Sequence, residues 1–556
     1  MSLEKASFMK CALKYLKSLV WAVPGFLLWA SFPPHGEKMD VLFALVPLLW
    51  TVRRGDVRKA ARTCFFAGLV FWIATLSWMP AIVKNGGPLP LVLLGWGALG
   101  AYCALYFGAF GFLAAQVWRW ARAGGYARRL GAILVAEPIL WAGLELVRSR
   151  LGGGFAWNQL GVPLVNAGFG ACAALGGVYL VSACVVLING TFVSIAERML
   201  SQLLPGRVED APGWQAMPRT WRSIETFLPL ALVLVAFKAV PPLRLLSNEV
   251  PGVSVALVQR NFPCVFDRER ARRENPADIY ARLLGNIAPL KPDLVVLPES
   301  ALAEFGTARS RGAAAFASAA LDASQAKALL AGGTRLDGTR EYNSAVLFTA
   351  SEAPRVGAQG LAVQIYDKNH LVPFGEYIPG DKTFPALQKL APVGSCTPGE
   401  LTTLDFGETR LGVAICFEDT DSAHVRRLAE KGANLLAFIT NDSWFAQSVE
   451  AEQHAWQAVA RAIETGLSVV RVGNSGVTGV ISPNGVFAYL TDDAGRALVD
   501  EPGTMVERLE TPRVAPTPYV RFGDKPLFVL FALLVAAIAL SLLSLRRQPT
   551  GDVRIV

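Results

Sequence analysis

Residues 411–419 read LGVAICFED, and this stretch decides how the rest of the chain is organised. It begins with an unbroken apolar run, which predicts a short strand that is buried on both faces. The strand ends at Cys416, and the acidic residues Glu418 and Asp419 follow almost at once. Open α/β sheets place their chemistry at the C-terminal ends of strands, so Cys416 is a candidate nucleophile. A buried core cysteine is the alternative that this stretch alone leaves open.

Two further stretches favour the nucleophile. DLVVLPES (293–300) is a predicted strand that ends on Glu299, and YDKNHLVPFGEYIP (366–379) carries Lys368. A cysteine attacks as its thiolate, and an unperturbed thiol has a pKa of about 8.5, so it needs a base that takes its proton. Glu299 suits that base, and Lys368 suits a cation that stabilises the oxyanion of acyl transfer. Taken singly, each residue also has a structural explanation: a helix cap for Glu299 and a solvated loop charge for Lys368.

A Glu, a Lys and a Cys in this chain order, with the Glu and the Cys each closing an apolar strand, resemble the nitrilase (carbon-nitrogen hydrolase) superfamily. The long lysine motif and the apolar segments described below narrow the resemblance to the apolipoprotein N-acyltransferase family. It implies that Glu299, Lys368 and Cys416 are catalytic. It also implies supporting roles for Glu376 and Glu418, because a second carboxylate beside a Glu–Lys pair can orient the lysine.

The same resemblance predicts the residues of a substrate pocket. The run NDSWF (441–445) is similar to the family's N-D-x-W-F pattern, and Phe417 directly follows the nucleophile. Phe417, Asn441 and Trp444 are therefore expected to line the pocket. Packing in the protein core is the alternative left open for Trp444.

Two charged residues are predicted on the membrane side of the site. Glu145 and Arg148, followed by GFAWNQLG (154–161), resemble the family's E-x-x-R and G-F-x-W order, although Ala156 stands where the family typically has Pro. Charged side chains at membrane depth usually face a protein interior. We expect Glu145 and Arg148 to form a pair on the lipid-entry side of the site. The sequence suggests no role for Glu137.

The composition indicates a membrane protein. The chain has 556 residues, 53% of them hydrophobic, and its mean hydropathy is +0.37. Its net charge is +9, but the basic residues lie mostly in short loops between apolar runs, which argues against a nucleic-acid-binding face. The eight cysteines form no CxxC pair and the four histidines do not cluster. We therefore expect no metal and no cofactor; a disulfide between Cys264 and Cys396 is left open.

Eight apolar segments are predicted to span the membrane as helices. The first two are short against the roughly 20 residues that a span needs. The segments are Leu19–Phe32, Met39–Val52, Thr63–Val83, Leu89–Trp118, Ala132–Val147, Ala171–Ile195, Phe227–Val240 and Pro526–Leu545.

The loops between these segments predict the orientation. One side carries the N-terminal lysines and arginine-rich loops around residues 53–62, 119–129, 198–222 and 546–547. By the positive-inside rule this side, with both termini, is cytoplasmic. The chain then divides into a membrane domain (1–244), an outer domain (245–520) and a C-terminal helix with its tail (521–556). In a bacterium the protein would lie in the inner membrane, with the outer domain in the periplasm.

The outer domain is predicted to be layered α/β. Its apolar strand candidates alternate with helical stretches, which favours helices that cover a β-sandwich. The resemblance implies the αββα sandwich of nitrilases. The strand candidates are residues 253–259, 293–299, 328–335, 343–350, 411–417, 433–441 and 467–473, and the helices are 267–288, 312–327 and 449–465.

The resemblance implies an acyltransferase that completes lipoprotein lipidation. Its donor would be a membrane phospholipid, phosphatidylethanolamine by expectation, and its acceptor the N-terminal amine of a diacylglyceryl-cysteine. A thioester on Cys416 would link the two half-reactions. Two alternatives stay open: a membrane-anchored amidase, which would use the same three residues, and a transporter or receptor, which would have no use for them.

Overall fold

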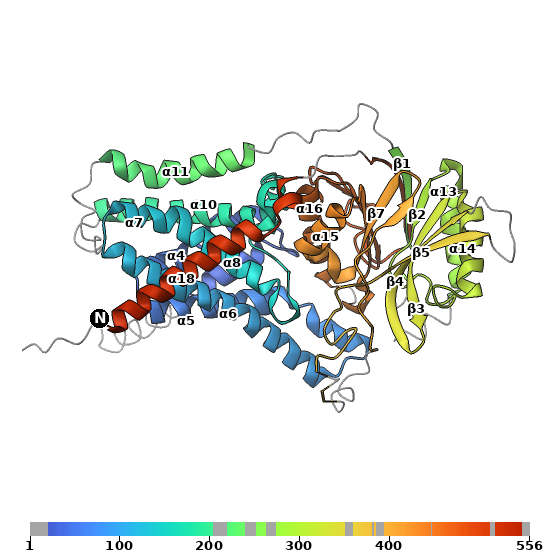
Figure 1. Cartoon of the computed structure of the whole chain (residues 1–556), viewed down its shortest axis with the longest axis horizontal. Coiled ribbons are helices and arrows are strands. Elements are labelled where there is room, and N and C mark those ends of the chain that lie inside the picture. The colour runs from blue at the N-terminus through green and yellow to red at the C-terminus, as the bar shows by residue number, and fades with distance from the viewer. Residues whose placement is uncertain are drawn as a thin grey trace, which may run out of the picture.

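The computed structural model shows a bundle of helices at one end and a two-sheet domain at the other (Figure 1). A C-terminal helix returns from the two-sheet domain into the bundle. The structure describes residues 21–203, 219–238, 252–262, 274–350, 360–380, 383–384, 394–445, 448–511 and 517–547.

The bundle consists of helices of very different lengths. They are α2 (Ala22–Ala30), α3 (Val41–Ala44), α4 (Val46–Arg53), α5 (Val57–Thr75), α6 (Leu89–Arg122), α7 (Tyr126–Gly131), α8 (Glu137–Arg148), α10 (Ala173–Leu203), α11 (Arg219–Lys238) and α18 (Lys525–Arg547). Short helices α9 (Val162–Asn166) and α17 (Pro518–Phe522) lie at the junction with the sheets.

Five helical segments of the described residues are long and apolar enough to cross a membrane: Val57–Asn85, Leu89–Arg122, Tyr126–Arg148, Ala173–Leu203 and Lys525–Ser544. They coincide with five of the eight predicted spans. Helix α2 has nine residues and α4 eight, so each is about half the length that a bilayer requires. The predicted first span begins, and the seventh ends, outside the described residues. The count of eight therefore stays a prediction.

A buried ion pair ties the bundle together, and it gives Glu137 a role that the sequence did not suggest. Arg53 of α4 donates two hydrogen bonds to the Glu137 carboxylate, at 3.1 and 3.0 Å. Trp118 of α6 donates a third at 2.8 Å, and Arg53 also bonds to Ser194 of α10. Both charges are buried. A charge this deep is stable only when paired and hydrogen-bonded, so the pair locks four helices together.

The two-sheet domain contains two six-stranded sheets. The first has the order β12 (Gly503–Glu510), β1 (Gly252–Gln259), β2 (Leu294–Val296), β3 (Ala328–Asp337), β4 (Arg340–Ala350) and β5 (Leu361–Asp367). The second has the order β11 (Phe487–Tyr489), β10 (Gly479–Ile481), β9 (Val469–Asn474), β8 (Leu435–Asn441), β7 (Thr409–Ile415) and β6 (Leu404–Phe406).

Parallel strands form the centre of each sheet: β1, β2 and β3 in one, and β7, β8 and β9 in the other. Such strands are buried on both faces, which explains the unbroken apolar runs of the sequence. All seven predicted strands are present. Five further strands were not predicted, and each is half exposed, short or at the edge of its sheet. They are β5, β6, β10, β11 and β12.

Helices cover the outer face of each sheet, so the predicted αββα sandwich is confirmed. Helices α13 (Pro276–Ile287) and α14 (Arg311–Ser324) pack on the first sheet, and α15 (Ser422–Glu430) and α16 (Glu450–Thr465) on the second. Helix α13 accounts for the described part of the predicted helix 267–288, whose residues 267–273 lie outside the described residues. An apolar core of inward-facing residues, such as Leu257 and Val413, fills the space between the sheets.

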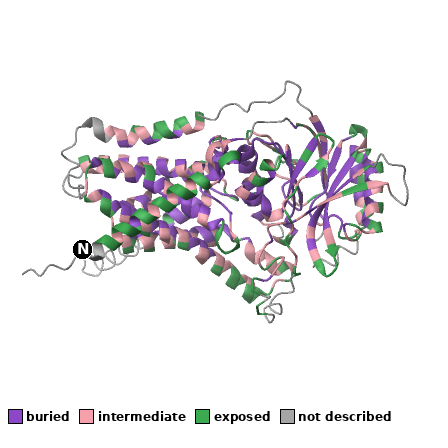
Figure 2. Ribbon diagram, in the orientation of Figure 1, coloured by how far each residue is buried: buried purple, intermediate pink, exposed green. Residues whose placement is uncertain are grey.

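Helices α15 and α16 lie between the second sheet and the bundle (Figure 1). One continuous apolar cluster joins them to the membrane helices, and buried residues run through the junction (Figure 2). Gln453 of α16 accepts hydrogen bonds from Trp78, Trp157 and Asn158 of the bundle side, at 3.2, 3.0 and 3.3 Å. The same amide donates to the backbone oxygen of Pro33 at 2.9 Å. The junction is therefore packed and specifically hydrogen-bonded.

Candidate active site

Cys416 lies where β7 ends and a single 3₁₀ turn, η7 (Cys416–Thr420), begins. Its φ is +52°, in the left-handed region. A residue with a side chain pays a steric penalty there, so surrounding contacts must stabilise the turn. The geometry turns the Cys416 side chain out of the strand direction. It is the sharp strand-to-helix turn on which an exposed nucleophile is commonly presented.

Glu418 supplies the contacts that fix this turn. Its carboxylate is fully buried and accepts the Ile415 N–H at 2.9 Å, just before the nucleophile. It also accepts the N–H groups of Asn369 and His370, at 2.7 and 2.9 Å, and the hydroxyl of Tyr366. Glu418 therefore joins the nucleophile turn to the segment that follows Lys368, across the two sheets.

Glu299 follows β2 and is buried. The strand end is fixed by two backbone hydrogen bonds to the β3 side, from Leu297 to Leu330 and from Gly332 to Pro298. Position 332 requires glycine, because a Cβ there would lie 2.5 Å from the Glu299 Cα. This close approach sets the direction in which the Glu299 side chain enters the site.

Lys368 follows β5, and its ammonium group is buried within a hydrogen-bonded set of acids. Its Nζ donates to Glu376 at 2.9 Å. Asn343 of β4 donates both to Glu376 at 2.8 Å and to Glu299 at 2.7 Å. The second Glu376 oxygen accepts the N–H of Val372 at 2.8 Å. Glu376 thus orients Lys368, and Asn343 fixes the distance between the two acids.

Burial and neighbouring charges shift the pKa values of Glu299, Cys416 and Lys368. Burial raises the pKa of Glu299 to about 7, against the opposing effect of Lys368. Burial, together with Glu299, also raises the pKa of the Cys416 thiol well above its usual value. For Lys368 burial acts the other way, but the negative charge of Glu376, with further contributions from Cys416 and Glu299 when these are ionised, outweighs burial and raises the pKa of Lys368. The resting site therefore holds a neutral thiol and an ammonium group, with a carboxyl that ionises near neutrality.

The three candidate catalytic residues share one buried site, since the charges of Glu299 and Lys368 act on each other and both act on the Cys416 thiol. A carboxylate with a pKa near 7 can take a thiol proton at physiological pH. A fixed ammonium can stabilise an oxyanion without rearranging. The arrangement is suited to attack by the sulfur on an acyl carbonyl.

The three predicted pocket residues differ in their surroundings. Phe417 is half-buried and stacks on Phe155 and Trp157, with ring centroids 5.9 and 6.4 Å apart. Trp444 is 42% exposed, which excludes the core-packing alternative. The Asn441 side-chain oxygen accepts bonds from Ser443 within its own turn. The pocket role of all three stays a prediction.

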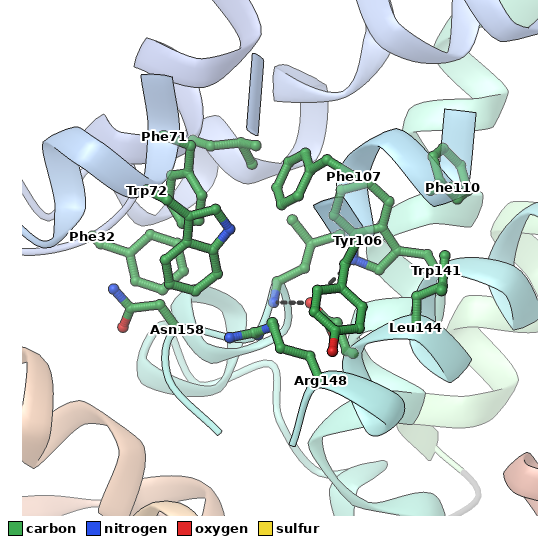
Figure 3. A pocket seen from close by; sticks show the side chains of 13 residues that line it. Phe32, Phe71, Trp72, Tyr106, Phe107, Phe110, Trp141, Leu144, Arg148 and Asn158 are labelled. Atoms are coloured by element: carbon green, nitrogen blue, oxygen red, sulfur yellow. Dashed lines mark hydrogen bonds between the residues drawn. The ribbon is translucent and has the colours of Figure 1, made fainter. Parts of the chain in front are cut away.

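Glu145 and Arg148 both line a small, mostly apolar cavity inside the bundle (Figure 3). They do not form the expected pair: no ion pair joins these two described residues. Glu145 accepts the Leu160 N–H and the Trp141 indole N–H, whereas Arg148 donates to the backbone oxygens of Phe155 and Trp157 at 2.8 and 2.9 Å. The loop that follows α8 therefore supplies separate partners to the two side chains: the Leu160 N–H to Glu145, and two backbone oxygens to Arg148.

Aromatic side chains link the cavity to the active site. The cavity lining includes Phe71, Trp72, Phe107 and Trp141, which face one another in Figure 3. Trp72 also contacts Phe155, with ring centroids 6.0 Å apart. Because Phe155 stacks on Phe417, aromatic contacts run continuously from the cavity to the residue beside the nucleophile.

One group of acids and a histidine in the described residues is close enough to hold a cation: Asp442, Glu450 and His454. Both ring nitrogens of His454 already face aspartates, and Arg471 lies 3.6 Å from Asp442. Side chains therefore supply the positive charge in this cluster. Cys264, the other half of the possible disulfide with Cys396, lies outside the described residues.

Sequence reasoning missed several residues of the site. Asn343 begins a predicted strand and Tyr366 begins the lysine motif, but neither pattern marks them as site residues. Arg471 offered a clearer signal, since it is a lone charge within the apolar strand LSVVRVG. His454 offered none, because its two aspartate partners are distant in sequence.

Two family models match the chain, one in each half. The apolipoprotein N-acyltransferase N-terminal domain matches residues 24–191, and carbon-nitrogen hydrolase matches residues 255–500. Among solved structures, the amidase from Nesterenkonia sp. AN1 is 18% identical (TM-score 0.35, 50% of this chain and 98% of that one). The carbon-nitrogen hydrolase from Helicobacter pylori G27 is 19% identical (TM-score 0.34, 50% and 94%).

Curated relatives match over nearly the full length. The apolipoprotein N-acyltransferase of Geobacter metallireducens is 32% identical over 486 residues, which cover 85% of this chain and 86% of that protein. The corresponding protein of Photobacterium profundum is 25% identical over 540 residues, 96% of each. These matches confirm the expected membrane character, nitrilase-like fold and acyltransferase relationship. The chain belongs to the apolipoprotein N-acyltransferase family.

Proposed function

We propose that this protein transfers an acyl chain from a membrane phospholipid to the N-terminal amine of a diacylglyceryl-cysteine on a lipoprotein. The observation that carries the proposal is the Cys416 turn, which shares a buried site with Glu299 and Lys368 directly above a membrane bundle. The names of the relatives support a lipoprotein acceptor. Phosphatidylethanolamine is the proposed donor.

In the first half-reaction Glu299 removes the Cys416 thiol proton as the sulfur attacks the ester carbonyl. Lys368 stabilises the resulting oxyanion. When the tetrahedral intermediate collapses, the C–O bond breaks, and Glu299 returns the proton to the departing alkoxide. A lysophospholipid leaves, and the acyl chain remains on Cys416 as a thioester.

In the second half-reaction the α-amino group of the lipoprotein attacks the thioester. Glu299 takes one proton from the amine, Lys368 again stabilises the oxyanion, and the C–S bond breaks. The proton returns to the sulfur and regenerates the thiol. The product is an amide, which is more stable than the thioester, so transfer is favoured over the reverse step.

The membrane bundle explains why a nitrilase-like site would serve lipids. We propose eight spans, both termini in the cytoplasm, and a catalytic domain on the periplasmic face of the inner membrane. The acyl chain of the donor would enter along the aromatic contacts between the bundle cavity and Phe417. Arg148 would assist indirectly, because it fixes the segment that carries Phe155 and Trp157.

The proposal is tested by incubating the purified full-length protein with a phospholipid whose acyl chain is labelled. Without an amine acceptor, the label should accumulate on Cys416 as a thioester that neutral hydroxylamine releases. Cys416→Ala should abolish labelling, whereas Cys396→Ala, the matched control, should keep it. Adding a diacylglyceryl lipopeptide should move the label to the peptide amine. Release of free fatty acid to water alone would instead identify a hydrolase, and labelling of Cys416→Ala would exclude the nucleophile.

A further inference from the structure

His454 bridges two carboxylates, one in the nucleophile turn and one in the turn that follows β8. Its Nε2 lies 2.9 Å from an Asp419 oxygen, and its Nδ1 lies 3.1 Å from an Asp442 oxygen. Carboxylates only accept hydrogen bonds, so both ring nitrogens donate and the ring is an imidazolium. All three side chains are buried. Burial disfavours the charged ring, but the two aspartates outweigh it and raise the pKa of His454 to about 10.

The bridge lies next to the nucleophile. Asp419 belongs to the 3₁₀ turn that begins at Cys416. Asp419 is only three residues after Cys416 in the chain. Asp442 opens the next turn, η8 (Asp442–Phe445), which follows β8. The His454 ring also contacts Trp157, and their ring centroids are 5.5 Å apart. Trp157 in turn stacks on Phe417.

The charges around His454 balance one another. Besides the two aspartates, Arg471 of β9 and Glu450 of α16 face this cluster. Arg471 lies 3.6 Å from each aspartate, farther than His454, and is a weaker partner. Burial and the nearby Asp442 keep Glu450 protonated, because they raise its pKa well above its usual value. Two negative and two positive charges remain, and His454 is the closer of the two cations.

We propose that His454 is a positioning residue of the acyl-transfer site: as an imidazolium it clamps Asp419 of the nucleophile turn to Asp442 and balances their buried charge. The inference rests on the proposed function of Cys416. Without the imidazolium, the charge of Asp442 acts on Cys416 and Glu299 with less compensation. Asp442 already contributes to raising the pKa of both groups. Cys416 would then become harder to deprotonate.

The test measures the pH dependence of Cys416 alkylation by iodoacetamide in full-length protein, followed by mass spectrometry of its peptide. His454→Gln keeps hydrogen-bonding capacity but removes the charge. We expect its midpoint to move up by about one pH unit, which slows alkylation near neutral pH about tenfold. Asp442→Asn should move the midpoint down. The double variant should return toward the wild type, because both charges are removed together. His35→Gln, which removes a histidine ring that packs on Trp29 and bonds to neither aspartate, is the control for the substitution itself.

A purely structural role predicts a different result. Both single variants would then melt at lower temperature, with alkylation midpoints equal to the wild type, and the inference would be overturned. If His454→Gln does not fold, the Asp442→Asn variant decides the question: a downward shift of its alkylation midpoint supports the inference, and an unchanged midpoint overturns it. The proposed function is judged separately: a Cys416→Ala protein that still transfers acyl chains would refute the nucleophile, whatever the His454 variants do.

Discussion

Replacing Glu418 by Gln is the most direct perturbation of the nucleophile turn, because the side chain keeps its shape and loses only its charge and one acceptor. Oε2 accepts the Ile415 N–H, and Oε1 accepts the N–H groups of Asn369 and His370. A Gln amide can replace only one of these oxygens by NH₂. The cheaper arrangement turns the NH₂ group toward Ile415, because one backbone N–H then loses its acceptor, whereas the reverse arrangement leaves two backbone N–H groups without one. The Tyr366 hydroxyl bonds to both oxygens, so it keeps an acceptor in either arrangement.

The cost follows from this choice. A buried N–H left without an acceptor costs about 1–3 kcal/mol, and the surviving bonds each lose charge assistance worth roughly 1 kcal/mol. With two surviving backbone bonds, the lower end of this sum, about 3 kcal/mol, opposes the strained conformation of Cys416. If the turn relaxes to another conformation, the competent population falls roughly a hundredfold, since each 1.4 kcal/mol is a factor of ten.

The assay is the single-turnover rate of thioester formation from a labelled phospholipid, together with thermal unfolding of the same preparation. We expect Glu418→Gln to slow the rate roughly a hundredfold and to lower the melting temperature. Glu408→Gln is the matched control, because Glu408 is exposed on the turn between β6 and β7. A Glu418→Gln protein with wild-type rate and stability would refute the assignment of Glu418 as the residue that fixes the turn.

Three further predictions follow from the structure. Because burial raises the pKa of Glu299 to about 7 and the base must be ionised, acylation should rise with pH through about 7; Glu299→Gln should remove this rise and slow acylation roughly 10²–10⁴-fold, and a flat wild-type pH profile would contradict the base. Gln453→Leu should lower the melting temperature, because it leaves two buried indole N–H groups unpaired at about 1–3 kcal/mol each; unchanged unfolding would show that the junction does not depend on this amide. A reporter active only outside the cytoplasm should work when fused near Gly399 and be silent near Gly125, and the opposite pattern would reverse the proposed topology.

The sequence predicted the parts of this protein that repeat a local pattern. The central strands could be found because a strand buried on both faces reads as an apolar run, and β7 and β8 do so almost without interruption. Edge strands such as β5 and β12 have one buried residue or none, so no such pattern exists. The short helices α3 and α4 merged into one predicted span, because hydropathy does not register the break beside Pro47.

The site divides in the same way. Residues that end a strand or belong to a long motif could be predicted, as Glu299, Lys368 and Cys416 were. Their partners could not, because hydrogen bonds between distant segments leave no local signature. Asn343 is an ordinary strand residue until the fold places it between two acids. Glu145 and Arg148 show the converse error: helical spacing suggests a pair, but each side chain finds closer partners in the loop that follows.

The short turn that begins at Cys416 is the point at which all parts of the molecule meet, and its 3₁₀ geometry explains how. With three residues per turn, successive side chains leave in three directions. Phe417 points to the aromatic residues of the bundle, Glu418 to the segment after Lys368, and Asp419 to His454 of α16. Asp421, just beyond the turn, accepts a bond from Arg150 of the bundle at 2.7 Å. A nucleophile in a strained conformation needs support from every side, and the membrane domain supplies part of that support. The bundle is therefore a structural component of the catalytic site as well as its anchor.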